Sequence, residues 1–201
     1  MSRSSKAKLK IAVDLDGVLA ETMEVWCKKA SELLGHRIRL EDLDSWASWR
    51  KFGITKDQFF LLLDEAWDSW EEIPPTEPGL AAKVAKVELL GSLDIVTGRS
   101  KQTVEGAKNW LAHHKIPYER FVRVQGWRDK VFLNYDVYID DAPELMPLIS
   151  RNPRMRAILY TRPWNRDVSS MPRVFRVENW AQIPSVLERC ARRESLDLRS
   201  A

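Results

Sequence analysis

The sequence predicts an α/β protein, a three-layer α/β/α sandwich with a mainly parallel sheet and a small helical cap inserted after the first strand. Two observations support this prediction. Short runs rich in β-branched residues, each followed by a turn or a helix signal, recur along the 201-residue chain. The stretch 22–90, between the first two runs, has helical patterns but no convincing strand. Strands that alternate with helices are typical of a parallel sheet with helices on both faces.

Six short runs are the expected strands. Each is bounded by turn residues, which is the pattern of a buried strand. They are Leu9–Asp14, Ser92–Thr97, Phe121–Gln125, Tyr135–Asp140, Arg156–Thr161 and Val174–Val177. Apolar residues at helical spacing lie between the later runs, over 104–111, and after the last one, over 183–190.

The stretch 22–90 is expected to form a unit of its own. Its apolar spacing predicts three helices, over Glu21–Leu34, Lys56–Trp70 and Leu80–Leu90. The breaker EIPPTEPG at 72–79 marks a linker within it. The stretch is too long for a simple crossover between neighbouring strands. We therefore expect a core domain of residues 1–21 and 91–201 and a helical cap domain of residues 22–90.

The composition is that of an ordinary globular protein, with 44% hydrophobic and 30% charged residues. No apolar run approaches the roughly 20 residues of a membrane span, and we expect no membrane association. The first ten residues are polar and basic rather than a secretory signal, so we expect a cytoplasmic location. The two cysteines lie far apart, which argues against a disulfide scaffold or a Cys-based zinc site. The net charge of +3 argues against nucleic acid as a partner but allows a local basic pocket.

Asp14 and Asp16, in the stretch KIAVDLDGVLAET, stand one residue apart at the end of the first expected strand. Ligands of open α/β sheets bind at that edge. Three interpretations compete: an Asp-Gly turn, a calcium loop, or a catalytic pair in which one carboxylate is nucleophile and metal ligand and the other is a general acid and base. The further oxygen ligands of an EF-hand loop are missing, and the other two interpretations stay open.

Two more strand ends bring polar residues to the same edge. Thr97, Gly98 and Arg99 offer a hydroxyl, a glycine amide and a helix N-terminus, which can cradle a phosphate, although alone they fit a turn and a helix cap equally well. Asp140 and Asp141 end another strand, in YIDDAP. Carboxylates that converge at one edge repel each other and need a cation. An all-oxygen ligand set in a small site favours Mg²⁺.

Four motifs therefore follow each other in the chain: DLDGVL, IVTGR, Lys130 in GWRDKVF, and IDDAP. In this order and spacing they resemble the four motifs of the haloacid dehalogenase-like hydrolase superfamily, over about residues 9–165. The resemblance implies a Rossmann-like core and a covalent mechanism. Asp14 would attack phosphorus and form an aspartyl-phosphate, and Asp16 would protonate the leaving alcohol and later activate water. The second aspartate favours phosphatases over the dehalogenase branch.

The resemblance also implies a ligand set. Metal ligation would fall on Asp14, the Asp16 backbone carbonyl and Asp140, with Asp141 orienting a metal-bound water. Thr97 and Lys130 would hold the phosphate, a lysine there offsetting the repulsion between two approaching anions. From the pattern at the end of the second strand, and not from the resemblance, we expect Gly98 and Arg99 to complete the phosphate site.

The helical insert and the stretches RDKVFLNYDVYIDDAP and YTRPWN look like the C-type 5′(3′)-deoxyribonucleotidase family and its microbial relatives. The function expected is therefore a Mg²⁺-dependent phosphatase of a small phosphorylated metabolite, most plausibly a (deoxy)nucleoside monophosphate. A polynucleotide or sugar phosphatase of the same fold is the nearest alternative. A non-catalytic nucleic-acid-binding module is the alternative of another class. The oligomeric state stays open, a homodimer included.

Aromatic residues are concentrated in the insert: Trp26, Trp46, Trp49, Phe59, Phe60, Trp67 and Trp70. They could stack a nucleobase. For any single tryptophan, however, a place in the core of the insert is the better-supported interpretation. Trp46 and Trp49, in the polar stretch EDLDSWASWRKFG, are our candidates for substrate contact, with Arg50, Trp164 and Asn165 as further ones.

Overall fold

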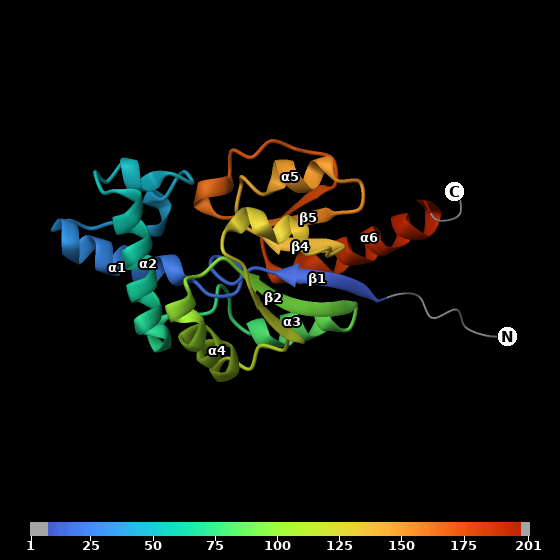
Figure 1. Ribbon diagram of the computed structural model, residues 1–201, viewed down its shortest axis with the longest axis horizontal. Helices are drawn as coiled ribbons and strands as arrows, with labels where there is room; N and C mark the ends of the chain where they lie inside the picture. The colour runs from blue at the N-terminus through green and yellow to red at the C-terminus, as the bar shows by residue number, and fades with distance from the viewer. Residues whose placement is uncertain (1–7, 198–201) are drawn as a thin grey trace.

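The computed structural model describes the backbone of residues 8–197 and the side chains of residues 8–191 (Figure 1). Most of the N-terminal segment interpreted above as carrying no secretory signal lies outside the described residues. A single six-stranded sheet has the order β3-β2-β1-β4-β5-β6, and every neighbouring pair is parallel. The strands are β1 (Leu9–Val13), β2 (Gly91–Thr97), β3 (Arg120–Arg123), β4 (Val137–Asp140), β5 (Arg156–Tyr160) and β6 (Val174–Val177). The predicted parallel α/β architecture is confirmed.

β1 lies inside the sheet, with β2 on one side and β4 on the other. Its Ile11 pairs with Leu93 of β2 on one side and with Val137 of β4 on the other. The chain therefore builds outwards from β1 in one direction through β2 and β3 and then in the other through β4, β5 and β6. The strand order reverses at β1, and ligands of such sheets bind at that point of reversal, beyond the carboxyl ends of the strands.

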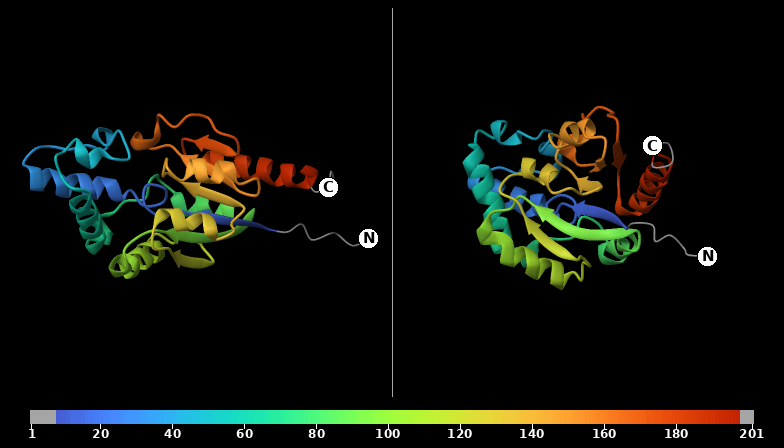
Figure 2. Two further views of the ribbon diagram at one scale, coloured as in Figure 1. Left: turned by 45° about the horizontal axis from the view of Figure 1, so that its top comes forward. Right: turned by 45° about the vertical axis from the view of Figure 1, so that its right-hand side comes forward.

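Helices cover both faces of the sheet, so the sheet is the middle one of three layers. Alternate side chains of the strands fall into two separate apolar clusters, as the pleat requires. Ile11 and Ile95 share one cluster with α3 (Leu80–Glu88), α4 (Val104–His113) and α6 (Ile183–Asp197). Ala12 and Val96 share the other with the short helix α5 (Met146–Arg151). Figure 2 shows α6 lying against the sheet and the two helices α1 and α2 apart from it.

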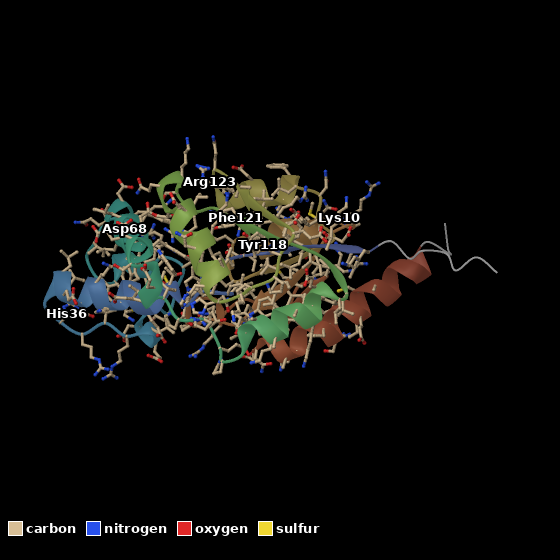
Figure 3. All side chains as sticks on the ribbon, turned by 90° about the horizontal axis from the view of Figure 1, so that it is seen from below. Lys10, His36, Asp68, Tyr118, Phe121 and Arg123 are labelled. Atoms are coloured by element: carbon tan, nitrogen blue, oxygen red, sulfur yellow. The ribbon has the colours of Figure 1, made fainter. Side chains whose placement is uncertain are left out.

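The helices α1 (Thr22–Leu34) and α2 (Lys56–Asp68) stand beyond the carboxyl edge of the sheet, since β1 runs toward them in Figure 1. They pack on each other through a third apolar cluster that contains Trp26 and Leu62. α2 begins with a capping box, in which the Thr55 hydroxyl accepts from the Gln58 amide at 3.1 Å and the Gln58 side chain accepts from the Thr55 amide at 2.8 Å. Figure 3 shows His36, which follows α1, and Lys10, on β1, toward opposite ends of the molecule.

The third helix expected in the insert packs on the sheet. Leu80, Val84 and Val87 of α3 belong to the apolar cluster of Ile11 and Ile95. The division of the chain into a core and a cap at residue 90 remains a prediction. Among the described residues, no helix has both the length and the apolar character that crossing a membrane requires.

Candidate active site

Asp14 is held at the edge of the sheet directly after β1. Its backbone amide donates to the Ile139 carbonyl at 2.9 Å, and its Oδ1 accepts from the Leu15 amide at 2.8 Å. The turn that follows depends on Gly17, whose φ is +74°. A Cβ atom at this position would lie 2.2 Å from Oδ2 of Asp141, so any other residue there would collide with a carboxylate of the site.

Three carboxylates and one ammonium group meet at this edge. One oxygen each of Asp14, Asp140 and Asp141 lies within 4.8 Å of the others. Lys130, from the 3₁₀ helix η5 (Trp127–Phe132), places its Nζ 3.0 Å from Oδ1 of Asp14 and 2.7 Å from Oδ2 of Asp140. The sequence-predicted residues of the first, third and fourth motifs therefore form one cluster, in which a single cation faces three acids.

The pKa values of the cluster reflect burial first and the repulsion among its carboxylates second. Burial raises the pKa of Asp14 to about 7, and the charges of Asp140 and Asp16 add to that effect while Lys130 opposes it. Burial and the neighbouring Asp14 and Asp140 also raise the pKa of Asp141 well above its ordinary value. Burial alone would lower the pKa of Lys130, but Asp14 and Asp140 raise it above the usual lysine range, so this side chain stays a cation.

The donor set fits a hard divalent cation. Its members are carboxylate oxygens, which Mg²⁺ prefers, and an added cation would offset both the burial of these charges and the repulsion between them. The sequence-based prediction of Mg²⁺ as cofactor is consistent with this chemistry.

The loop after β4 has its own supporting contacts. Oδ1 of Asp140 accepts from the Ala142 amide at 2.9 Å. Oδ2 of Asp141 accepts from Nε1 of Trp164 at 3.1 Å. The Asn165 side-chain amide donates to the carbonyls of Asp141, at 2.9 Å, and Tyr160, at 2.8 Å. Trp164 and Asn165, which were further candidates for substrate contact, thus support Asp141 from the 3₁₀ helix η6 (Pro163–Asn165).

The second motif reaches the same edge from β2. The register pairs Val13 with Ile95, so Thr97 stands two residues further along, level with the turn after β1. Thr97 is buried, and its hydroxyl accepts from the Arg99 amide at 3.2 Å. Gly98 passes close to η5, because a Cβ atom on it would lie 3.5 Å from the Trp127 amide. Their predicted role as phosphate ligands remains a prediction.

Asp16 has a different surrounding from Asp14. Its Oδ1 accepts three hydrogen bonds, from the Thr22 hydroxyl at 2.7 Å, from Nε1 of Trp67 at 2.8 Å and from the Arg99 guanidinium at 3.0 Å. Its side chain is 23% exposed, against 12% for Asp14. The two aspartates of the first motif therefore differ in environment, which paired catalytic acids require.

Three partners of this site were not foreseen from the sequence. Trp67 was expected among the aromatic residues of the insert, but its hydrogen bond to Asp16 was not. Asp64 forms an ion pair with Arg99, and Glu21 forms one with Arg162. These pairs join residues 35 and 141 positions apart. The one available signal was the spacing of Asp64 and Trp67, three residues apart on α2, which places both on one face of that helix.

Trp46 and Trp49 lie among apolar residues of the insert. Both are partly buried, and the Trp49 ring lies 5.7 Å from that of Phe59. Trp46 also packs against the apolar cluster of α5. Trp26, in contrast, is fully buried and donates to the Phe59 carbonyl at 3.0 Å, as expected of a core residue. Substrate contact by Trp46 and Trp49 remains a prediction.

Comparison with known proteins agrees with this geometry. The sequence profile of the family described as 5′ nucleotidase, deoxy (pyrimidine), cytosolic type C protein matches residues 8–193. The mitochondrial 5′(3′)-deoxyribonucleotidase of Mus musculus is 27% identical over 196 residues, which are 90% of this chain and 85% of that protein.

Solved structures share the fold at low sequence identity. A haloacid dehalogenase-like family hydrolase of Xanthomonas campestris superposes with a TM-score of 0.63 at 10% identity, over 94% of this chain and 98% of that one. A HAD hydrolase of Bacillus subtilis, solved bound to magnesium, superposes with a TM-score of 0.56 at 12% identity, over 91% and 100%. The chain belongs to the cytosolic type C 5′-nucleotidase family, and its fold is the one shared by haloacid dehalogenase-like hydrolases.

Proposed function

We propose that the protein is a Mg²⁺-dependent phosphatase that hydrolyses the phosphomonoester of a 5′(3′)-(deoxy)nucleotide through an aspartyl-phosphate on Asp14. The observation that best supports this is the cluster of Asp14, Asp140 and Asp141 around Lys130, next to a second aspartate in a different environment. The nucleotide as substrate is supported by the family match and by the mouse relative, which is named for deoxyribonucleotide hydrolysis.

The first chemical step is a transfer of the phosphoryl group to Asp14. An oxygen of Asp14 attacks phosphorus, the bond from phosphorus to the leaving oxygen breaks, and Asp16 gives its proton to that oxygen. Thr97, the amide of Gly98 and Lys130 stabilise the phosphoryl oxygens, whose charge is spread in the transition state. Lys130 is suited to this, because it already contacts Asp14 at 3.0 Å and is held in place by Asp140.

The second step releases phosphate. A water molecule gives a proton to Asp16, its oxygen forms a bond to phosphorus, and the bond from phosphorus to Asp14 breaks. Asp16 thereby regains the proton that it lost in the first step. Asp14, Asp140, Asp141 and the backbone carbonyl of Asp16 would hold the Mg²⁺ ion, which when bound neutralises charge between Asp14 and the phosphate dianion.

The cap of residues 22–90 covers the site and selects the leaving group, while residues 1–21 and 91–201 supply the chemistry. The position of α1 and α2 at the carboxyl edge of the sheet supports this (Figure 1). Trp46 and Trp49 are the candidates for contact with the base. Arg50 is exposed in the same segment.

A panel of phosphate esters tests the proposal. It contains nucleoside 5′- and 3′-monophosphates, sugar phosphates, an oligonucleotide 3′-phosphate and p-nitrophenyl phosphate, each with Mg²⁺ and with EDTA. We expect the fastest turnover with nucleoside monophosphates, turnover only with Mg²⁺, and its loss in Asp14→Asn. Asp57→Asn, an exposed change on α2, is the matched control and keeps wild-type turnover. Full activity of Asp14→Asn would contradict the covalent mechanism, and a preference for sugar phosphates would contradict the substrate class.

A further inference from the structure

The helix α2 reaches Asp16 in two ways. Trp67 donates directly to Oδ1 of Asp16 at 2.8 Å. Asp64, one turn earlier on the same face, forms an ion pair with the guanidinium of Arg99, which in turn donates to the same Oδ1 at 3.0 Å. The third donor, the Thr22 hydroxyl at 2.7 Å, belongs to the first residue of α1. Each of the three hydrogen bonds on Oδ1 therefore involves the insert. Thr22 and Trp67 of the insert donate directly, and Arg99 is held by Asp64 of the insert.

Arg99 has all three of its nitrogen atoms engaged. One terminal nitrogen contacts Asp16, the other contacts Asp64, and Nε donates to the Thr103 hydroxyl at 3.2 Å. The guanidinium also lies over the Trp67 ring, 5.5 Å from its centroid, and the residue is 6% exposed. A planar group held on every side in this way has little freedom to turn toward a phosphate. It is well suited to holding two carboxylates at a set separation.

The hydrogen bonds to Asp16 fall on one of its two carboxyl oxygens, Oδ1, and leave Oδ2 to carry the catalytic proton. Within the described part of the chain, Oδ1 of Asp16 has three donors and Oδ2 has none. A carboxyl group carries its proton on one oxygen only. Three donors that face Oδ1 exclude the proton from that oxygen and also prevent rotation of the group.

We propose that Arg99, Asp64 and Trp67 are positioning residues for Asp16, so that proton transfer to the leaving oxygen from Oδ2 depends on α2 being seated against the core. The proposal rests on the proposed function. It assigns Arg99 a task other than phosphate binding. It also makes the insert part of the acid catalysis, because withdrawal of α2 would remove Trp67 and the ion-pair partner of Arg99 together.

The experiment compares two leaving groups in single turnovers with enzyme in excess. The first ester is the best-hydrolysed nucleoside or sugar monophosphate of the panel, whose alkoxide must be protonated as it leaves. The second is p-nitrophenyl phosphate, whose phenolate leaves without a proton. We expect Asp64→Asn and Arg99→Lys to slow leaving-group release from the alkyl ester about 10-fold or more, a part of the roughly 100- to 10,000-fold that general acid catalysis contributes, and release from the aryl ester less than about 3-fold.

Two controls separate positioning from damage to the fold. Trp67→Phe keeps an aromatic ring but removes the N–H donor to Asp16 together with part of the indole, and it is expected to show the same selectivity in weaker form. Glu72→Gln breaks an exposed ion pair of the insert, with Lys28, and is expected to leave both esters unaffected. The aryl ester reports in every variant whether Asp14, Lys130 and the phosphate site are intact.

The outcomes distinguish the two proposals. If the wild-type enzyme hydrolyses neither ester, the proposed function fails. If it hydrolyses both, and Asp64→Asn and Arg99→Lys slow them equally or slow neither, the positioning role is overturned while the proposed function stands.

Discussion

Nζ of Lys130 lies 2.7 Å from Oδ2 of Asp140, and both side chains are 3% exposed or less. The lysine comes from a 3₁₀ helix before β4, and the aspartate ends that strand, so a local segment of the chain brings a cation into a group of acids. The same ammonium group also reaches Asp14, directly after the neighbouring strand β1. It therefore connects the two central strands at their carboxyl ends.

The first prediction concerns Lys130→Met, which keeps most of the volume and removes the charge. Removal of one member of a buried ion pair leaves its partners uncompensated and typically costs about 3–5 kcal/mol. We expect the free energy of unfolding in EDTA to fall by that order, and turnover to be lost. Urea unfolding measures the first and the ester panel the second. Lys28→Met, which breaks an exposed ion pair, is the control and is expected to leave both unchanged; equal stability of the two variants would contradict the prediction.

The second prediction concerns the metal. Binding to the folded state alone stabilises it, by about 2.7 kcal/mol at a free concentration 100 times the Kd. We expect Mg²⁺ to raise the melting temperature of the wild-type protein, and Asp140→Asn to lose most of that rise. Differential scanning fluorimetry with and without EDTA measures it. Asp57→Asn should keep the rise, and an undiminished rise in Asp140→Asn would place the ion elsewhere.

The third prediction is a pH dependence of the metal-free protein. Burial raises the pKa of Asp14 from 3.8 to about 7, and the pKa of Asp141 is raised as well. Between pH 3.8 and about 7 the folded state holds a proton on Asp14 that the unfolded chain has released, so the contribution of Asp14 to stability falls as the pH rises over this interval and levels off above it. Urea unfolding in EDTA between pH 5 and 8 measures the fall. We expect Asp14→Asn to reduce the fall, and a flat profile for the wild-type protein would contradict the assignment.

The fourth prediction compares two glycines with nearly the same backbone conformation. Gly17 has φ +74° and Gly35 has φ +70°, but only at Gly17 would a Cβ atom meet another group, Oδ2 of Asp141 at 2.2 Å. Gly35→Ala should therefore cost only the left-handed conformation, about 1–2 kcal/mol. Gly17→Ala should cost more and abolish turnover, since it displaces Asp141. Thermal melting and the ester panel measure both, and equal effects of the two changes would show that the site tolerates the displacement.

The strands could be predicted because their signal is local. The run Leu9–Asp14 became β1, Leu9–Val13, and Val174–Val177 is β6 with the same bounds. The helix α5 was not predicted, because six residues are too few to show a helical period and Pro147 follows its first residue. Most of the candidate site could also be predicted from the sequence, since parallel strands bring their carboxyl ends to one edge of the sheet and thus bring Asp14 and Asp140 together.

The surroundings of Asp16 could not be predicted. Its hydrogen bonds to Trp67 and Arg99 span 51 and 83 positions and depend on how α2 sits against the core. Arg99 follows a Thr-Gly pair at a strand end, and this position favoured the prediction that Arg99 binds phosphate. Its two carboxylate partners come from other elements, and no local pattern points to them.

The central place of β1 has a consequence for synthesis of the chain on the ribosome. β1 is made first, but its two neighbours begin only at Gly91 and Val137. Until the second of these emerges, one side of β1 keeps unpaired backbone groups and an apolar face that can associate with other chains. A nascent or truncated chain that ends before Val137 also lacks Asp140 and Asp141. Such fragments should need chaperones and should gain nothing from Mg²⁺.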